Sequence, residues 1–399
     1  MRVCGVICEY NPFHNGHGYH LTQAKTLSQA DYLVCAMSGF FSQRGEPMLA
    51  DKWSRARMAL RCGADLVLEL PTLFAVRPAE QFALGGVALL RALGADALAF
   101  GSECGDLAAL RQAAALLEEE TPSFHAELRA ELAQGATLAR ARSSALAGTL
   151  PPDTVKALAQ PNSALAVCYL RALRAAGGGV EPILIPRVGG GYHDHKPGPL
   201  ASATAVRAAV QAGRWEDIRA AMPAPAYALL RNAHERGGLH APGALGTALL
   251  AMLRSMPRSA IAALCDVNEG LENRIQRAAW TAGTREDLLA AAKCKRYTHA
   301  RLSRILCATL LGMTRETADR YPAPAYARVL GFRADARPLL AHLKRNAALP
   351  LITKVASCSL LHGDCFDMDL RATDLWALGC ASHAARAARR DFLTSPVIV

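Results

Sequence analysis

The sequence predicts an α/β protein in which a doubly wound parallel sheet of the Rossmann-like type is followed by a mostly helical domain. Short apolar runs alternate with helix-like segments through the first half of the 399 residues, and polar loops follow several of these runs. After about Met222, strand candidates become rare. Strands that alternate with helices favour a parallel sheet covered on both faces. Right-handed crossovers then bring the strand ends to one edge, where ligands bind.

Five buried strands and five helices are expected to alternate in the first half. The strands are expected at residues 3–8, 32–37, 65–70, 97–100 and 182–185, and the helices at residues 17–29, 52–61, 79–93, 107–119 and 163–175. A further pair of helices is expected within residues 121–147. We therefore assign residues 1–222 to a first domain built around the sheet.

The second half is predicted to be mainly helical. Residues 223–325 are expected to form a helical domain, with helices at 244–256, 271–282, 285–292 and 298–312. Residues 326–399 are expected to form a mixed α/β tail, with short strands near 327–331 and 351–353 and a helix at 372–390. The longest weakly charged stretch contains Pro242 and several glycines, so it makes a poor membrane span. The apolar start is interrupted by Glu9, so no signal peptide is expected.

The most informative motif follows the first strand and leads into the first helix. It contains His14 and His17 three residues apart, and Gly16 between them lets the backbone approach closely. A helix N-terminus offers unpaired N–H groups and partial positive charge, which suit a phosphate. The imidazoles can donate to phosphate oxygens as negative charge builds up on them. The alternative is a pair of loop histidines satisfied by backbone. The pattern resembles the signature of nucleotidyltransferases that split ATP between its α- and β-phosphates.

A second motif contains Ser202, Thr204 and Arg207, and it follows a Gly- and His-rich loop at residues 189–194. Ser202 can cap a helix, and Thr204 and Arg207 then share one face of its first turn. A hydroxyl and a guanidinium placed there could hold the β- and γ-phosphates. The alternative is a plain Ser cap beside a solvated Arg. Nucleotidyltransferases of the His-x-Gly-His type carry a similar Ser/Thr-x-x-Arg element.

Other loop residues allow two interpretations. In the polar stretch after the second strand, Arg44 or Lys52 could neutralise phosphate and Ser38 could bind a small acid, or the stretch is a surface turn before a helix that begins at Asp51. Three further residues stand at or near later strand ends. Gly101 could let an adenine lie against backbone or be a simple turn, Asn162 is most simply an N-cap, and Arg187 has no nearby acid and suits phosphate or ribose.

Together these motifs resemble the bacterial tRNA(Met) cytidine acetate ligase family. The likeness rests on residues 9–17, 38–39, 43–47, 51–55, 63–71, 100–103, 202–207, 269–274 and 295–298. It implies that acetate is activated with ATP and that the acetyl group passes to the wobble cytosine of elongator methionine tRNA. The implied ATP-site residues are Ile7, Cys8, Glu9, Tyr10, Asn11, Pro12, Phe13, His14, Asn15, Gly16, His17, His20, Gly101, Asn162 and Arg187. The chain departs from the family pattern at Phe40, Ser163, Ala166 and Cys168.

A basic stretch in the second half points to RNA. Lys and Arg number 45 against 34 Asp and Glu, which suits a polyanionic partner but also ordinary solubility. Between residues 274 and 304 eight basic residues outnumber two acidic ones, with an aromatic among them. Such a run is usually a solvated face, but its density and the family likeness favour RNA. The candidate RNA-binding residues are Lys293, Lys295, Arg296, Tyr297, Arg301 and Arg304.

The sequence therefore predicts a cytoplasmic two-step ligase that uses ATP, with Mg²⁺ assisting and no metal site of its own. His14, His17, Ser202, Thr204 and Arg207 are the predicted catalytic residues. The twelve scattered cysteines fit a reducing compartment. Two alternatives stay open: a small-molecule adenylyltransferase, which would not need the basic helical half, and a non-enzymatic RNA-binding protein with a relic nucleotide fold.

Overall fold

The computed structural model describes residues 1–119, 121–136, 141, 144–147, 149–187, 201–268, 270–358 and 363–399. The Gly- and His-rich loop at 189–194 and Glu269, which belongs to the family-like run at 269–274, lie outside these residues.

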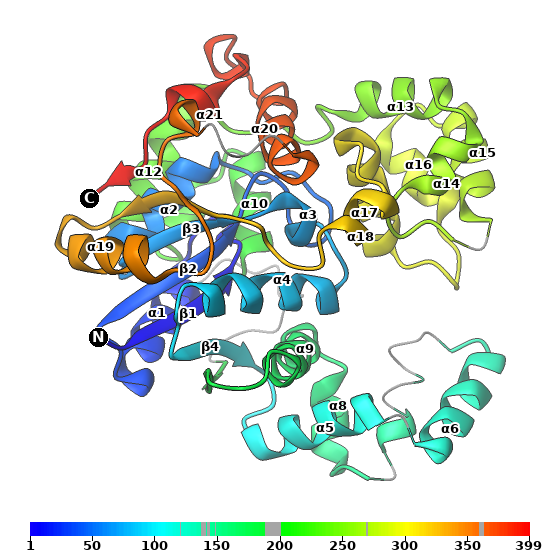
Figure 1. The fold of residues 1–399 in the computed structure, drawn as a ribbon. Coiled ribbons are helices and arrows are strands. Elements are labelled where there is room, and N and C mark those ends of the chain that lie inside the picture. Colours follow the sequence, from blue (N-terminus) through cyan, green and yellow to red (C-terminus); the bar gives the residue numbers. More distant parts are fainter. Residues whose placement is uncertain are drawn as a thin grey trace.

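Across the described residues, eight strands form one sheet in the order β5-β4-β1-β2-β3-β6-β7, with β8 paired to β6 (Figure 1). The strands are β1 (Val3–Cys8), β2 (Tyr32–Ser38), β3 (Leu66–Leu70), β4 (Ala97–Ser102), β5 (Glu181–Pro186), β6 (Ala327–Phe332), β7 (Leu351–Ile352) and β8 (Val397–Ile398). Strands β1 to β5 are parallel, as predicted. Strand β6 enters antiparallel to β3, so the sheet is mixed. The chain order reverses between β1 and β4, as a doubly wound sheet requires.

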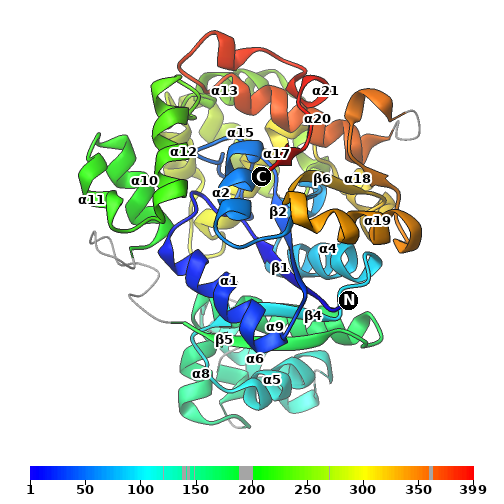
Figure 2. The same cartoon turned by 90° about the vertical axis from the view of Figure 1, so that its left-hand side faces the viewer.

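Helices cover both faces of this sheet. Helices α1 (Asn15–Ser28) and α2 (Lys52–Arg61) lie on one face, and α4 (Ala79–Ala92) and α9 (Pro161–Ala175) lie on the other. Figure 2 shows α1 and α4 on opposite sides of β1. Close packing on the second face depends on small residues. A Cβ on Gly86 of α4 would come within 2.5 Å of Ile7 Cδ1, so only glycine lets the helix approach the sheet this closely.

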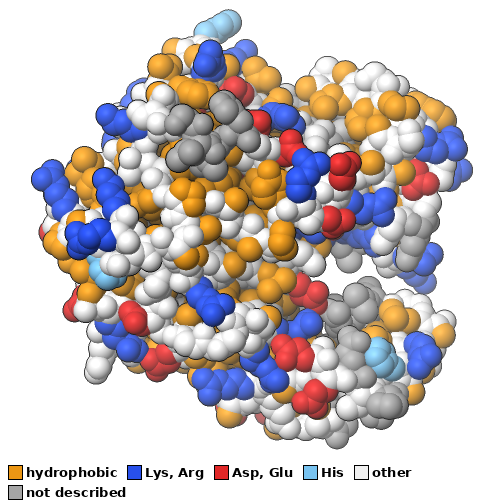
Figure 3. Space-filling view, viewed as in Figure 1, with side chains coloured by type: hydrophobic (Ala, Val, Ile, Leu, Met, Phe, Trp, Pro, Cys, Tyr) orange, Lys and Arg blue, Asp and Glu red, His pale blue; other side chains and the backbone are white. Residues whose placement is uncertain are grey.

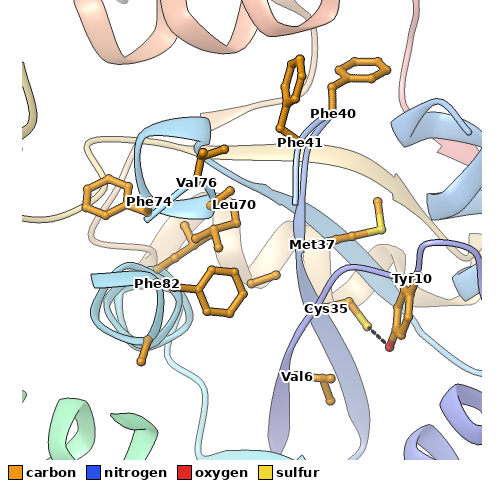
Figure 4. Close-up of a cluster of buried hydrophobic side chains, with 14 of the residues drawn as sticks. Val6, Tyr10, Cys35, Met37, Phe40, Phe41, Leu70, Phe74, Val76 and Phe82 are labelled. Atoms are coloured by element: carbon orange, nitrogen blue, oxygen red, sulfur yellow. Dashed lines mark hydrogen bonds between the residues drawn. The ribbon is translucent and has the colours of Figure 1, made fainter. Parts of the chain in front are cut away.

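The core is built on both faces of the sheet from side chains of the strands and of the segments that follow them. Figure 4 shows Phe74 and Phe82 on one side of the central strands, and Val6, Cys35 and Met37 on the other side, where the Tyr10 hydroxyl lies 3.6 Å from Cys35 Sγ. All six side chains are buried. This core fixes the strand ends from which the functional loops emerge.

Two groups of helices extend beyond the sheet. The first packs on α9 and includes α5 (Leu107–Glu119), α6 (Pro122–Ala133) and α8 (Pro152–Leu158). The second, which we call the helical lobe, comprises α13 (Gly246–Ser255), α14 (Arg258–Ala263), α15 (Leu271–Thr281), α16 (Arg285–Ala292), α17 (His299–Leu311) and α18 (Arg315–Arg320). Between the two lie α10 (Ala203–Gln211), α11 (Trp215–Arg219) and α12 (Ala224–Glu235) in the sequence. None of the described helices combines the length and apolar character needed to span a membrane.

The tail returns to the sheet of the first segment. It contributes β6 to β8 and adds α19 (Arg337–Asn346), α20 (Asp364–Ala377) and α21 (Arg390–Leu393). The predicted helix at 372–390 is wrong, because α20 begins earlier and ends at Ala377. Gly379 packs so tightly on His240 that a Cβ there would lie 2.1 Å from His240 Nε2, and the chain turns at this contact. The proposed boundaries at 222 and 325 stay a prediction, but residues 1–222 and 326–399 share one sheet.

Candidate functional site

A cavity of about 380 Å³ opens at the carboxyl edge of the sheet, beside the reversal point between β1 and β4. Its walls come from the ends of β1, β4 and β5 and from the first turns of α1, α9 and α10. The size is typical of a small-ligand pocket. The predicted site residues that line it are Ile7, Cys8, Glu9, Tyr10, Asn11, His14, Gly16, His17, His20, Gly101, Asn162, Arg187, Ser202, Thr204 and Arg207.

Three predicted ATP-site residues do not line this cavity. Pro12 and Phe13 are buried in the loop after β1, where the Phe13 ring packs 4.8 Å from the Tyr10 ring. Asn15 points away and donates from its side-chain amide to Ala220 O at 2.7 Å. Asn15 therefore anchors the loop to the residues that follow α11, and its backbone N–H donates to Ala221 O at 2.9 Å as well.

The two histidines of the first motif form a fixed stacked pair at the start of α1. Their ring centroids are 3.6 Å apart, and the backbone N–H of His14 donates to His17 Nδ1 at 3.2 Å. A neutral His17 therefore carries its proton on Nε2. A Cβ on Gly16 would lie 3.0 Å from His14 Cε1, so glycine at this position leaves room for the stacked rings.

All three cavity histidines are neutral near pH 7. Burial, followed by the charges of Arg187 and Arg207, lowers the pKa of His14 to about 4. Burial, with Arg187, lowers the pKa of His20 to about 4, and burial with the neighbouring histidines lowers the pKa of His17 well below 6.5. The cavity thus offers neutral N–H donors beside fixed arginine cations, an arrangement suited to an incoming polyanion.

These shifts predict a pH-dependent loss of stability. Between the ordinary histidine pKa of 6.5 and the folded value of about 4, the unfolded chain binds protons that the folded chain does not. The free energy of unfolding should therefore fall as the pH falls through this window. Discounted for partial exposure, each histidine contributes about 1 kcal/mol between pH 7 and pH 5. In urea titrations, His20→Asn should lose less stability over this range than the parent. His342→Asn, which changes an exposed histidine, should match the parent. Equal losses in all three proteins would contradict the assignment.

The second motif faces the first across the cavity. Ser202 caps α10, because its hydroxyl accepts from the Ala205 N–H at 3.2 Å. Arg207 then reaches back, donating to Asn11 O at 2.8 Å and to Thr204 Oγ1 at 3.2 Å. The guanidinium therefore bridges the loop of the histidine motif and the first turn of α10. The structure brings the two motifs together.

A carboxylate organises the opposite wall. Glu103 accepts from Asn162 Nδ2 at 2.6 Å and from the Ser163 N–H at 2.8 Å, and it lies 3.6 Å from Arg187 Nε. The expectation that Arg187 has no nearby acid is therefore wrong. Asn162 is not the N-cap either, because Gln160 takes that position and Asn162 lies in the first turn. Burial alone would raise the pKa of Glu103, but the hydrogen bonds from Asn162 and Ser163 outweigh burial and lower that pKa.

The polar stretch after β2 divides between the core and the cavity. Lys52 and Ser38 are fully buried, and Lys52 pairs with Glu69 at 2.8 Å, so Lys52 is not available to a phosphate. Asp51 caps α2, as the turn interpretation predicts. Arg44 does line the cavity.

Glu46 lines the cavity beside Arg44, although it was not among the predicted site residues. It belongs to the run at 43–47 that carries part of the family likeness, and this run is the sequence signal from which Glu46 could have been predicted.

The four departures from the family pattern lie mostly away from the cavity. Phe40 is a core residue that packs against Trp53 and Trp376. Ser163 is buried and its hydroxyl lies 2.9 Å from Ser102 Oγ, so it holds the end of β4. Ala166 is buried in α9 and Cys168 is half-buried on the same helix.

The candidate RNA-binding residues separate into two sets. Lys293, Lys295 and Arg296 are exposed on the helical lobe, at and beside a tight turn closed by the bridge between Cys294 and Tyr297. Figure 3 shows Lys and Arg side chains gathered along the edges of this lobe. The other three residues, Tyr297, Arg301 and Arg304, are turned inward.

Inward packing corrects the prediction for Tyr297 and Arg304. The Tyr297 ring is buried, and the Arg301 guanidinium lies 5.2 Å from its centroid. Arg304 forms an ion pair with Asp266 at 2.7 Å, and both side chains are largely buried. The buried Tyr297 ring is therefore not available for a base to stack on, whereas Arg301 is half-buried, donates to Asp266 O and stays a predicted RNA-binding residue.

No group of three or more His, Cys, Asp or Glu side chains within the described ranges could hold a metal ion.

The doubly wound sheet and the facing His-x-Gly-His and Ser-x-Thr-x-x-Arg motifs define the class: the chain belongs to the HIGH Nucleotidyl Transferase family, which it matches over residues 1–391. It is similar to the tRNA(Met) cytidine acetate ligases of Acetivibrio thermocellus (37% identity, 100% of both chains) and Halothermothrix orenii (38% identity, 100% of this chain and 99% of the relative). The crystal structure of Thermotoga maritima TmcAL bound with alpha-thio ATP matches with a TM-score of 0.92 at 33% identity, covering 100% of both chains. The apo form of that protein gives a TM-score of 0.94. The resemblance noted from the sequence is confirmed.

Proposed function

We propose that this protein is a tRNA(Met) cytidine acetate ligase, which uses ATP to join acetate to the wobble cytidine of elongator methionine tRNA. The observation that supports it best is the single cavity into which both family motifs point, in a chain related over its full length to ligases of that name. The cavity holds the chemistry that a triphosphate needs: two stacked imidazoles, a helix N-terminus, and the guanidinium groups of Arg187 and Arg207.

In the proposed first step, acetate attacks the α-phosphate of ATP and pyrophosphate leaves. His17 Nε2–H donates to oxygens on which negative charge develops, and Arg207 and Thr204 hold the leaving pyrophosphate. Gly101 supports an adenine against the end of β4. A Cβ there would lie 3.7 Å from Arg187 Cγ, an ordinary contact, so the protein itself does not require glycine. A ligand lying against the backbone would require it.

In the proposed second step, the exocyclic amine of the cytosine attacks the acetyl-adenylate and AMP leaves. No covalent enzyme intermediate is needed, because the acetyl group is already activated. The exposed turn with Lys295 and Arg296 suits the tRNA backbone. Mg²⁺ remains part of the proposal, bound through the phosphates. A cytoplasmic location also remains proposed. It is supported by the twelve cysteines, all of which are free thiols.

One assay tests this function against its two alternatives. The protein is incubated with ATP, labelled acetate and total tRNA, and the tRNA is digested and searched for acetylated cytidine. We expect labelled N4-acetylcytidine and release of pyrophosphate that depends on acetate. A small-molecule adenylyltransferase would release pyrophosphate with no label in tRNA. An RNA-binding protein without enzymatic activity would release none, and either result would refute the proposal.

Charge reversal at the exposed turn should weaken tRNA binding. In Lys295→Glu/Arg296→Glu, each lost phosphate contact should reduce the slope of log affinity against log salt by about one. The control is Lys344→Glu/Arg345→Glu, an adjacent Lys-Arg pair exposed on α19 outside the helical lobe. Filter binding at several salt concentrations would measure both slopes. Equal slopes for the two double variants would remove the 295–296 turn from the RNA-binding surface.

A further inference from the structure

A second, smaller cavity adjoins the candidate nucleotide site. It has a volume of about 190 Å³ and shares two of its lining residues, Glu46 and Arg207, with the larger cavity. Its remaining wall is mainly apolar and includes Phe41 from the loop after β2, Leu249 of α13 and Leu310 of α17. It therefore lies where the sheet meets the helical lobe. A cavity of about 150 Å³ lined by apolar side chains accepts benzene, so a single six-membered ring fits this space.

Glu46 is held at the junction of the two cavities by its own loop. The Gly45 N–H donates to Ser42 O at 2.8 Å, and the Ser42 N–H donates to Glu46 O at 2.8 Å. The turn is fixed to α17, because Ser303 Oγ donates to Gly45 O at 3.1 Å. Gly45 has a φ of +74°, and a Cβ there would lie 2.6 Å from Arg304 Cα. The backbone of Glu46 is thus placed by both the sheet domain and the helical lobe.

The Glu46 side chain is half-buried, and no hydrogen bond or ion pair engages its carboxylate within the part of the chain that the structure describes. A carboxylate with free acceptor capacity matches an exocyclic amine, as in the pairing of Glu or Asp with cytosine N4. Uracil carries a carbonyl at the same position. Its oxygen is a hydrogen-bond acceptor, as is the Glu46 carboxylate, so the two groups could not form a hydrogen bond. Pockets that receive a base flipped out of its stack combine apolar walls with polar groups that read the edge of the base. Besides Glu46, the polar residues that line this cavity are Arg207, Gln211, His240, Arg285 and Glu286.

We propose that the smaller cavity binds the acceptor cytosine and that Glu46 binds its exocyclic amine; this inference rests on the proposed function. The amine nitrogen attacks the carbonyl carbon of the acetyl-adenylate, forming the C–N bond. The bond between that carbon and the phosphate oxygen breaks, and AMP leaves with its electron pair. The nitrogen loses one proton, which passes to the Glu46 carboxylate. No oxidant or further reactant is needed.

Two variants and three measurements test this role. Glu46→Gln keeps the shape of the side chain but removes its negative charge, and Ala244→Trp fills the cavity from an exposed lining position. Each is assayed for acetate-dependent exchange of labelled pyrophosphate into ATP, for single-turnover acetyl transfer, and for binding of anticodon stem–loops that carry cytosine or uracil at the target position. Glu316→Gln, an exposed carboxylate on α18, is the control.

For Glu46→Gln, acetyl transfer should fall at least about a hundredfold more than exchange, since a positioned general base contributes roughly 10²–10⁴-fold. Its preference for the cytosine stem–loop over the uracil one should fall by about fivefold or more. Ala244→Trp should show the same split between transfer and exchange, and the control should match the parent. Parental transfer rates in Glu46→Gln or in Ala244→Trp would overturn the inference. Absence of acetylcytidine with the parent protein would overturn the proposed function as well, so the two failures are distinguishable.

Discussion

His17→Ala should reduce acetate-dependent exchange of pyrophosphate into ATP by about 10²–10³-fold, because removing one preorganised donor to developing charge has an effect of that size. His17 Nδ1 is already occupied by the His14 N–H, so Nε2–H is the group that the ring can offer to a ligand. The ring also stacks on His14, and alanine would leave that partner unsupported. The tRNA affinity should stay within about twofold, since the basic turn lies on the helical lobe.

Exchange of labelled pyrophosphate and filter binding with tRNA measure the two quantities separately. His342→Ala changes an exposed imidazole on α19 and serves as the control for nonspecific loss of a histidine. If His17→Ala exchanged at the parental rate, the histidine pair would have no part in adenylation. If tRNA binding fell as far as exchange, the variant would have lost its fold rather than its chemistry.

The sequence predicted the sheet well because its strands are short, apolar and regularly separated by helices. The first five strands and the helices that follow them lie within a few residues of the expected positions. In the tail, the strands predicted near 327–331 and 351–353 are present as β6 and β7. Strand β8 was not predicted, because it has two residues and its pairing with β6 is decided by contacts far away in the sequence. Helix α20 ends at Ala377, and Gly379 follows its C-cap Leu378. A glycine in this position is a local signal for a helix end, and the predicted range 372–390 ran past it.

In the candidate site, too, local sequence predicted the positions of residues along the chain, whereas features decided by tertiary contacts could not be predicted. Residues at a strand end or a helix start, such as His14, Gly101 and Ser202, reach the cavity because the fold gathers those positions. Their roles stay predictions. Burial of individual side chains could not be predicted. Lys52 and Tyr297 occupy motifs that suggest ligand binding, yet both are buried in contacts whose partners come from other elements.

Lys52→Met should lower the free energy of unfolding by about 3–5 kcal/mol, because it removes one partner from a buried ion network. Lys52 Nζ lies 2.8 Å from a carboxylate oxygen of Glu69 and 2.8 Å from one of Asp391, and all three side chains are almost completely buried. Arg328 contacts the same two acids, at 3.1 Å and 2.5 Å. Burial alone would raise the pKa of Asp391, but Lys52 and Arg328 outweigh it and lower that pKa. Without Lys52, two buried carboxylates would share one cation.

The same network ties the tail to the sheet, since Glu69 belongs to β3, Arg328 to β6 and Asp391 to α21. Urea unfolding would measure the loss, with Lys25→Met as the control. Lys25 is 44% exposed and pairs with Asp65 at 3.6 Å, so its removal should cost about 1 kcal/mol or less. The affinity of folded Lys52→Met for ATP should equal that of the parent, because its ammonium faces the core. A stable variant with weakened ATP binding would instead restore Lys52 as a phosphate ligand and would require the loop after β2 to rearrange.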